Sequence, residues 1–323
     1  MNYQPQKIDC PQLAIVVPCY NEEPILYQTI EKLRALHHSM VAGGIIAEGS
    51  YILFVDDGSQ DDTWELISAA HRDRRECKGI RLSRNFGHQN ALLAGLMAVV
   101  NHCDVAVSID ADLQQDPEAI PKFIQEYLGG AEVVLGIRED RLADGWGKKV
   151  TAKFYYRFMN FMGAEIIPNH ADYRLMSSRA LKWLSQYSEP NLFLRAACSQ
   201  MSLRTATVHF SVYPRAAGKT KYSFGKMFKL ALDSIVSFSA APLRIITFIG
   251  LAIFVFSAAM GCYVIYQALA TGSVVPGWAS ITLPIYFLGG VQLLSLAIIG
   301  EYIAQALSTA KARPRFLIEE ELF

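Results

Sequence analysis

The chain has 323 residues, of which 52% are hydrophobic, and its 30 basic side chains balance its 30 acidic ones at pH 7. A net charge of zero argues against a nucleic-acid-binding protein and against a polyanion-binding surface. The six cysteines are scattered with no Cys-x-x-Cys pair, which argues against a disulfide framework or a zinc site and favours a reducing compartment. The polar first 11 residues are not expected to act as a signal peptide.

Short apolar runs alternate with segments of helical periodicity over the first 110 residues or so. The predicted strands are 13–17, 51–55, 80–82 and 105–109. The predicted helices are 25–33, 64–71 and 90–101. This alternation predicts an α/β fold with a mostly parallel sheet flanked by helices on both faces. Because such sheets bind ligands at the carboxyl ends of their strands, we expect a crevice formed by the loops after the first, second and fourth strands.

Two carboxylates one residue apart, Asp110 and Asp112, follow the fourth predicted strand. No basic residue separates them, so they repel each other unless a cation joins them. Their hard oxygen ligands favour Mg²⁺ or Mn²⁺. The alternative is a strand-end turn in which an aspartate caps the next helix.

A second acidic strand end, Asp56-Asp57-Gly58-Ser59, also has the composition of a β-turn. Two acidic strand ends in one parallel sheet would raise each other's pKa and cost stability without a partner. A divalent cation together with a nucleotide would supply that partner.

Two common nucleotide-binding motifs are absent. A dehydrogenase would carry G-x-G-x-x-G after the first strand, where residues 18–22 read PCYNE. Gly218-Lys219-Thr220 resembles the end of a P-loop, but position 213 is tyrosine where that motif needs glycine.

Several segments resemble known sugar-transferring enzymes. Those that resemble family 2 glycosyltransferases with the Rossmann-like GT-A fold are 17–22 (VPCYNE), 55–59 (VDDGS), 84–87 (RNFG) and 110–114 (DADLQ). Those similar to the polyprenyl-phosphate glycosyltransferases are 116–118 (DPE), 136–138 (GIR), 171–176 (ADYRLM) and 221–223 (KYS). The resemblance implies a metal-dependent, inverting transfer of one sugar from a nucleotide sugar to a membrane polyprenyl phosphate, either undecaprenyl or dolichyl phosphate.

The closer likeness is to bactoprenol glucosyltransferases, which favours glucose from UDP-glucose. UDP-GlcNAc, UDP-galactose and GDP-mannose remain alternative donors. A phosphate monoester acceptor has its second pKa at about 6, so at pH 7 it is already a nucleophile and needs no His or Cys base. His88 and His170, the histidines near the motifs, can therefore be merely polar loop residues.

The resemblance also implies roles for the residues at matching positions. The expected nucleotide-sugar-binding residues are Pro18, Tyr20, Glu22, Asp57, Asp110, Ala111, Gln114, Arg215 and Lys221. The expected metal ligands are Asp110, Asp112 and Gln114, and the expected acceptor-phosphate ligands are Arg138 and Lys149, with Lys148 as the alternative to Lys149. The expected catalytic residues are Asp112, Asp172 and Arg138. Tyr173-Arg174 could instead be part of a strand-end salt bridge.

The last third of the chain is strongly apolar. Residues 245–269 and 281–299 carry no charge, and their length predicts two transmembrane helices. Their positively charged flanks predict that the catalytic domain and both termini are cytoplasmic, on a multi-pass protein of the inner (plasma) membrane. Residues 153–162 and 224–232 are predicted interfacial helices, with core helices as the alternative.

The predicted domain order follows from these segments. It is a catalytic domain at 1–223 with an interfacial helix near 150–163, an interfacial helix at 224–243, a transmembrane domain at 244–307 and a tail at 308–323. We expect a nucleotide sugar, a polyprenyl phosphate and the membrane as partners, and self-association into a homo-oligomer.

Two other functions compete with this one. The first is a processive polysaccharide synthase on the same fold, which would carry a Gln-x-x-Arg-Trp motif that the sequence lacks. The second is a catalytically inactive, nucleotide-binding membrane scaffold, which would be expected to lose part of the metal and diphosphate set. Replacement of Asp112 by asparagine separates the enzyme from the scaffold, because only the enzyme would lose a sugar-lipid product.

Overall fold

The computed structural model describes residues 9–138, 170–189, 192, 194–211, 278–311 and 313–323, with a few positions between 250 and 266. The chain divides into two compact units. The first combines residues 1–156, 165–222 and 313–323, and the second combines residues 157–164 and 223–312. The predicted interfacial helices at 153–162 and 224–232 lie outside the described residues.

The first unit is built on a sheet of eight described strands, in the order β7-β5-β6-β4-β1-β2-β3-β8. The strands are β1 Leu13–Cys19, β2 Tyr51–Asp56, β3 Cys77–Leu82, β4 Val105–Ser108, β5 Val133–Arg138, β6 His170–Ser177, β7 Thr205–Phe210 and β8 Ile318–Leu322. The strands β4, β1, β2 and β3 run parallel, and β5 runs parallel to β7. The strand β6 is antiparallel to both β4 and β5, and β8 is antiparallel to β3. The four strands predicted from the sequence are confirmed, as is a mostly parallel α/β sheet.

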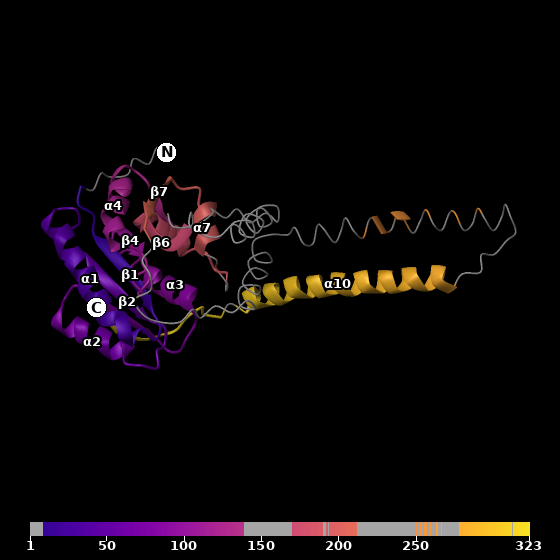
Figure 1. Ribbon diagram of the computed structural model, residues 1–323, viewed down its shortest axis with the longest axis horizontal. Helices are drawn as coiled ribbons and strands as arrows, with labels where there is room; N and C mark the ends of the chain where they lie inside the picture. Colours follow the sequence, from indigo (N-terminus) through magenta and orange to yellow (C-terminus); the bar gives the residue numbers. More distant parts are fainter. Residues whose placement is uncertain are drawn as a thin grey trace. The chain divides into compact units, whose positions relative to one another are not determined.

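Helices cover the sheet on both faces (Figure 1). They are α1 Glu23–Ala42, α2 Thr63–Asp73, α3 His88–Ala98, the 3₁₀ turn η1 Pro117–Ala119, α4 Ile120–Leu128, α6 Ser178–Leu184 and α7 Leu194–Gln200. The three helices predicted in this part of the chain are all present. The first continues to Ala42, well beyond the predicted end at residue 33, and is followed directly by Gly43 and Gly44.

Alternate residues of the central strand enter two separate cores, because successive side chains of a strand point to opposite faces. Leu13, Ile15 and Val17 of β1 pack with α1, α2 and α4. Ala14 and Val16 pack with α3, α6 and α7. At Gly95 of α3, a Cβ atom would lie 2.4 Å from Val16 Cγ1, so glycine allows α3 to approach the sheet closely. The sheet is therefore buried on both faces, and its strand ends carry the polar residues.

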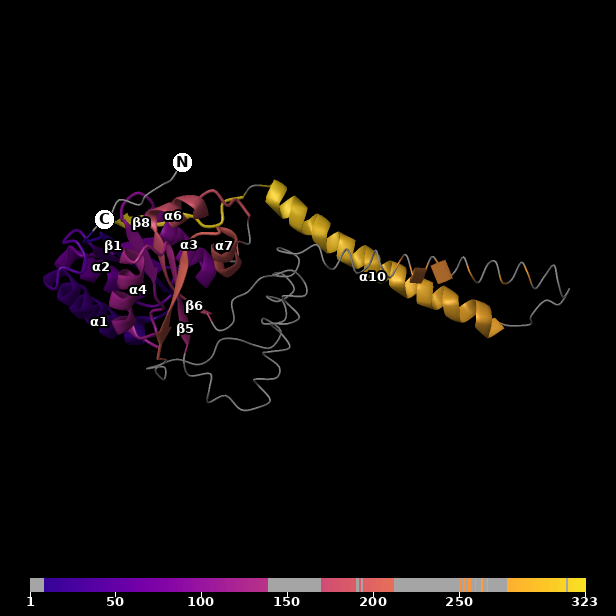
Figure 2. The same ribbon diagram turned by 90° about the horizontal axis from the view of Figure 1, so that it is seen from above.

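The C-terminal residues complete the sheet. The sequence predicts a tail at 308–323, whereas residues 318–322 form β8 and pair with the edge strand β3. Figure 2 shows β8 in the part of the molecule that holds β1 and α2, and the strand order places it next to β3. The Ser83 N–H donates to the Leu317 carbonyl at 3.0 Å, and the Arg315 guanidinium donates to the Tyr187 carbonyl. The end of the chain is thus part of the first unit.

The described part of the second unit is dominated by α10, Trp278–Ala310, which contains the predicted apolar segment 281–299. Among the residues that the structure describes, no helix is both long and apolar enough to cross a membrane. The sequence prediction of two crossings is therefore unsupported. Most of the first predicted crossing, 245–269, lies outside the described residues.

Candidate active site

Four loops meet at one edge of the sheet, because β1, β2, β3 and β4 are parallel and their carboxyl ends share that edge. The loops are residues 20–22, 57–62, 83–87 and 109–116. The sequence predicts the first, second and fourth of them as the crevice. The loop after β3 also belongs to it, because a side chain of the second loop holds it in place.

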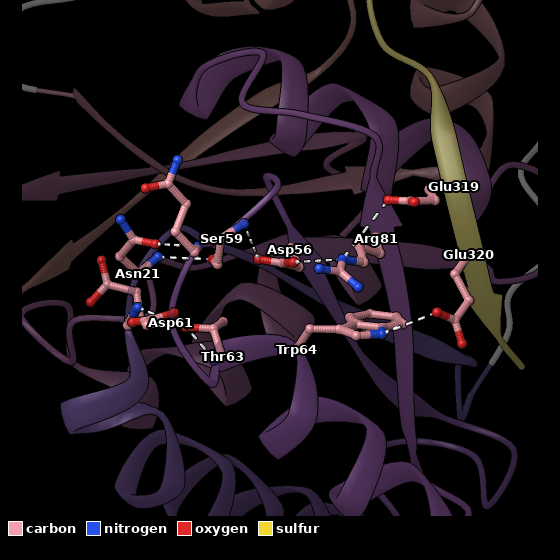
Figure 3. Close-up of polar contacts among 11 residues, drawn as sticks. Asn21, Asp56, Ser59, Asp61, Thr63, Trp64, Arg81, Glu319 and Glu320 are labelled. Carbon is pink, nitrogen blue, oxygen red and sulfur yellow. Dashed lines mark hydrogen bonds and ion pairs between the residues drawn. The ribbon is translucent and has the colours of Figure 1, made fainter.

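Asn21 locks the first loop to the second (Figure 3). Its backbone N–H donates to Ser59 Oγ at 2.9 Å, and its side-chain oxygen accepts from the Gln60 N–H at 2.9 Å. The φ angle of Asn21 is 53°, a left-handed conformation that asparagine tolerates better than most residues. The Glu22 N–H donates to Thr63 Oγ1 at 2.9 Å, so the start of α1 is tied to the start of α2.

Asp57 holds the loop after β3. Its Oδ1 accepts from the Phe86 N–H at 2.7 Å, and its Oδ2 accepts from the Gly87 N–H at 2.9 Å. Burial raises the pKa of Asp57, and these two hydrogen bonds act against that rise. Gly58 has a φ of +65°, and a Cβ atom there would lie 2.5 Å from the backbone carbon of Arg84. The loop after β3 therefore rests directly on the turn after β2.

Asp56, the neighbour of Asp57, is fully buried, and Figure 3 shows its carboxylate between Ser59 and Arg81. Its Oδ1 accepts from the Ser59 N–H at 3.1 Å, and its Oδ2 lies 3.7 Å from Arg81 Nε without a hydrogen bond among the described residues. Burial raises the pKa of this carboxyl group, while the bonds from Ser59 and the charge of Arg81 lower it. Arg81 Nε also lies 3.9 Å from Glu319 of β8, so the C-terminal strand is linked to the base of the site.

Asp110 lies where the loop after β4 meets the start of α3. Gln115, which is buried, donates from Nε2 to Asp110 Oδ2 at 2.7 Å and accepts the Asp110 N–H at 3.1 Å. On the other side, His88 Nε2 lies 3.5 Å from Asp110 Oδ1. The side chain of Asp110 keeps 30% of its surface exposed, so it is held by the protein and still open to a ligand.

The loop continues from Asp110 through Ala111 and Asp112 to Gln114. Ala111 is buried, and its carbonyl accepts from Thr29 Oγ1 of α1 at 2.7 Å. The Gln114 N–H donates to Asp112 Oδ1 at 3.1 Å, around a Leu113 with a left-handed φ of 55°. This turn keeps Asp112 and Gln114 on one small loop beside Asp110.

Asp172 enters the site from β6, which pairs with β4. The Ser108 hydroxyl donates to the Asp172 carbonyl at 2.6 Å, and Asp172 Oδ1 forms an ion pair with Arg174 at 2.5 Å. The alternative predicted for Tyr173-Arg174, a strand-end salt bridge, is therefore present through Arg174. This salt bridge still leaves Asp172 within the site, since the negative charge of Asp172 raises the pKa of Asp110.

The charges that act on Asp110 belong to residues that were predicted for the site and to His88. Burial raises the pKa of Asp110, His88 lowers it, and the negative charges of Asp172 and Asp112 raise it further. Arg138, at the end of β5, lowers it. Two carboxylates thus act on a third, with His88 and Arg138 as the opposing positive groups, and this crowding of negative charge is the setting in which a cation would be stabilising.

The remaining predicted nucleotide-sugar ligands divide into two groups. Pro18 is buried within β1, and Tyr20 and Glu22 are half-buried in the loop that follows it. Lys149, Arg215 and Lys221 lie outside the described residues, as does Lys148. Their predicted contacts with the acceptor phosphate and the diphosphate stay predictions.

The carboxylate oxygen atoms of Asp110 and Asp112 suit an ion such as Mg²⁺, which needs few protein ligands. Within the described ranges, no group of three or more His, Cys, Asp or Glu side chains is arranged to hold a metal ion. Mg²⁺ is usually held by one or two carboxylates, with substrate phosphates and water as the other ligands. Asp110 and Asp112 on their short loop fit that pattern, since they supply hard oxygen atoms and leave positions for a diphosphate.

Sequence reasoning assigned no role to Asn21 or Gln115, gave His88 only as a polar loop residue, and gave Arg174 only as part of an alternative salt bridge. Asn21 and Gln115 hold the loops, His88 contacts Asp110, and Arg174 contacts Asp172. Each is a polar residue within or next to a segment that resembles the family. A stricter reading of those segments could have marked them, although their partners depend on contacts between distant parts of the chain.

The family model for glycosyl transferase family 2 matches residues 14–184. The chain therefore belongs to glycosyl transferase family 2. The mannosyl-3-phosphoglycerate synthase of Rubrobacter xylanophilus has a similar structure, with a TM-score of 0.50 and 16% identity over 74% of this chain and 75% of that one. This likeness supports the GT-A-like α/β fold.

Within the family, the chain is similar over nearly its whole length to two kinds of relative. It is 44% identical to the uncharacterized glycosyltransferase YkoT of Bacillus subtilis, over 97% of this chain and 93% of that protein. It is 36% identical to the bactoprenol glucosyl transferase of Shigella phage SfX, over 95% of this chain and 99% of that protein. The predicted resemblance to bactoprenol glucosyltransferases is thus confirmed.

Proposed function

We propose that this glycosyltransferase moves a single sugar, with glucose favoured, from a UDP-sugar to the phosphate of a membrane polyprenyl phosphate. The observation that carries the proposal is that Asp110 and Asp112 follow β4, Asp172 lies at the start of the paired strand β6, and Arg138 ends β5, so all four lie at one edge of the sheet. Relatives named bactoprenol glucosyl transferase, similar over nearly the whole chain, support a polyprenyl phosphate as the acceptor. An acceptor of this kind makes the protein a membrane-associated enzyme.

The reaction joins two anions, and the charges of the site suit that task. An acceptor phosphate monoester has a second pKa of about 6 and is largely ionised at pH 7, so it needs no general base. Arg138 would bind its oxygens, and Asp110, Asp112 and Gln114 would hold a divalent cation. Such a cation, when bound, would offset the charge of the leaving diphosphate. Asp172 would lie beside both groups.

The transfer itself is a single displacement. An oxygen of the acceptor phosphate forms a bond to the anomeric carbon of the sugar, and the bond from that carbon to the donor diphosphate breaks. The electron pair leaves with the nucleoside diphosphate, and the sugar configuration inverts because attack and departure take place on opposite faces. Asp57 and the loop after β3 would close the nucleotide side of this site.

The decisive test is a product assay with several donors. Purified protein is incubated with undecaprenyl phosphate and labelled UDP-glucose, UDP-GlcNAc, UDP-galactose or GDP-mannose, and the lipids are extracted. We expect one sugar per lipid phosphate, with UDP-glucose the best donor, and no product with Asp112→Asn. Asp73→Asn, an exposed carboxylate at the end of α2, is the matched control and should retain full activity.

The same assay separates the competing functions. Products with several sugars per lipid would indicate a processive synthase. Binding of nucleotide without any labelled lipid, unchanged by Asp112→Asn, would indicate an inactive scaffold. Equal product from wild type and Asp112→Asn would contradict the proposed role of the carboxylate loop.

A further inference from the structure

A buried arginine lies directly behind the candidate active site. Arg174 is 0% exposed, and it occupies the centre of β6, opposite Ser108 of β4 and Leu135 of β5. Its terminal nitrogen atoms contact Asp172 Oδ1 at 2.5 Å and Cys198 Sγ at 3.5 Å. Its Nε atom is buried and has no hydrogen-bond partner among the described residues. Arg174 is therefore a buried cation whose main compensation is the carboxylate of Asp172.

Such an arrangement is a poor way to stabilise a fold. Removing a guanidinium and a carboxylate from water costs several kcal/mol per ion, and an apolar pair of similar volume is often as stable or more so. The neighbouring residues of β6, Tyr173 and Leu175, lie in the core on the side of α4, where the Tyr173 ring packs against Phe123. A reason other than stability is needed for a charged pair on the opposite face of the same strand.

The position of Asp172 supplies that reason. Asp172 and Arg174 are two residues apart on one strand, so their side chains project from the same face. The Ser108 hydroxyl fixes the backbone of Asp172 at 2.6 Å, and Arg174 fixes its carboxylate, whose side chain is only 14% exposed. Ser108 is the last residue of β4, two residues before Asp110. The two carboxylates are thus held by neighbouring strands.

We propose that Arg174 is a positioning residue, which holds the Asp172 carboxylate as an anion in one orientation beside Asp110. This inference rests on the proposed function, because the reaction assigned to the site gives Asp172 its task. Arg174 does not touch the substrate. It acts through Asp172, so its loss should affect turnover only when Asp172 is present.

A double-mutant cycle tests this. The variants are Arg174→Met, Asp172→Asn and the double variant, each assayed for kcat and KM with the acceptor and donor that the wild type uses best. We expect Arg174→Met to lower kcat by about 10- to 100-fold, the size of effect seen when a reacting group is displaced by about 1 Å, with little change in the KM for donor. In the Asp172→Asn background the same change should lower kcat less than threefold.

Two further variants keep the test open to failure. Arg174→Lys retains the charge without the planar fork, so we expect its kcat to lie between those of Arg174→Met and the wild type. This variant can also be assayed if Arg174→Met does not fold. Arg179→Met removes an arginine that pairs with Glu132 at 3.2 Å, and it should have wild-type kcat. Independent losses for Arg174→Met and Asp172→Asn, or wild-type kcat in folded Arg174→Met or Arg174→Lys, would overturn the inference.

A failure of the proposed function can be told apart from a failure of the role proposed for Arg174. If the wild type transfers no sugar to polyprenyl phosphate, the acceptor is wrong, and the cycle is then run with donor hydrolysis as the measured reaction. The coupling of Arg174 to Asp172 in thermal unfolding is measured in the same four proteins without any substrate.

Discussion

Asp57 accepts hydrogen bonds from two consecutive backbone N–H groups, those of Phe86 and Gly87. The family resemblance implies that this carboxylate binds the nucleotide, and its contacts add a second task within the protein. Since the loop it holds leads directly to His88, Asp57 also determines where His88 meets Asp110. One side chain thus connects the loops after β2, β3 and β4.

Asp57→Asn tests this task. The amide keeps one acceptor oxygen but presents an NH₂ group to a backbone N–H, so one hydrogen bond is lost and two donors face each other. We expect a loss of about 1–3 kcal/mol in the free energy of unfolding, together with weaker binding of UDP. Thermal unfolding with and without UDP measures both. Asp62→Asn, an exposed neighbour without a side-chain capping bond, should match the wild type.

Glu76 is a second residue whose contacts predict a measurable effect. Its Oε1 accepts from Arg34 Nε at 2.8 Å and from His38 Nε2 at 3.0 Å. Burial acts to raise the pKa of Glu76, but the hydrogen bonds from His38 and Arg34 outweigh it and lower the pKa from 4.5 to about 2. The folded state therefore favours the ionised form, and the resulting stability is present above pH 4.5 and is lost as the pH falls towards 2.

Glu76→Gln should remove this contribution. We expect the variant to be about 1–2 kcal/mol less stable than the wild type at pH 7, after allowance for solvent screening. The difference should shrink as the pH is lowered from 5 to 3, because the wild type then loses the same interaction. Urea unfolding across this pH range measures it, and a difference that grows towards acid pH would contradict the assignment.

The sequence predicted the elements that depend on local pattern. The apolar runs of β1, β2 and β4 are buried on both faces, so composition alone identified them as strands of a parallel sheet. The acidic and polar residues after them marked the edge where the site lies. The proposed roles of Asp110 and Asp112 come from their spacing and from the family resemblance, and they stay predictions.

The elements that were missed depend on distant pairing. β8 is acidic and largely exposed, and its strand conformation comes from pairing with β3, more than 230 residues earlier in the chain. Strand propensity is set by such neighbours as much as by the residues themselves. The same holds for β6, whose register against β4 places Asp172 near Asp110. Hydrophobic periodicity in the sequence does not predict how β6 pairs with β4.

Truncation after Leu317 tests the role of β8. The change removes the ladder with β3, the bond from Trp64 Nε1 to Glu320 Oε2 at 3.1 Å and the Arg81–Glu319 contact (Figure 3). We expect a loss of about 2–4 kcal/mol, since each ladder hydrogen bond contributes about 1 kcal/mol. The exposed edge of β3 should also promote aggregation.

Circular dichroism during heating and size-exclusion chromatography measure the two effects of truncation. The full-length variant Glu321→Gln keeps the ladder and both contacts, so it should behave as the wild type. A truncated protein that unfolds at the wild-type temperature would show that β8 does not support the sheet.

At the scale of the whole molecule, charge balance conceals a local imbalance. The chain is neutral overall, yet Asp110, Asp112 and Asp172 gather at one edge of the sheet, with Arg138 as a described counter-charge near Asp110. The proposed nucleoside diphosphate would bring further negative charge to this edge. Its binding should therefore depend on a divalent cation, because the carboxylates alone would repel it.

Thermal unfolding with UDP and Mn²⁺ tests this dependence without measuring turnover. Ligand at 100 times its dissociation constant stabilises a folded protein by about 2.7 kcal/mol, so UDP with Mn²⁺ should raise the unfolding temperature clearly. UDP with excess chelator should raise it little, and Asp112→Asn should show little rise even with Mn²⁺. Asp73→Asn should respond as the wild type does. If UDP stabilised the wild type equally in chelator, the carboxylates would have to act on the nucleotide without a metal, and the assignment of Asp110 and Asp112 as metal ligands would be wrong.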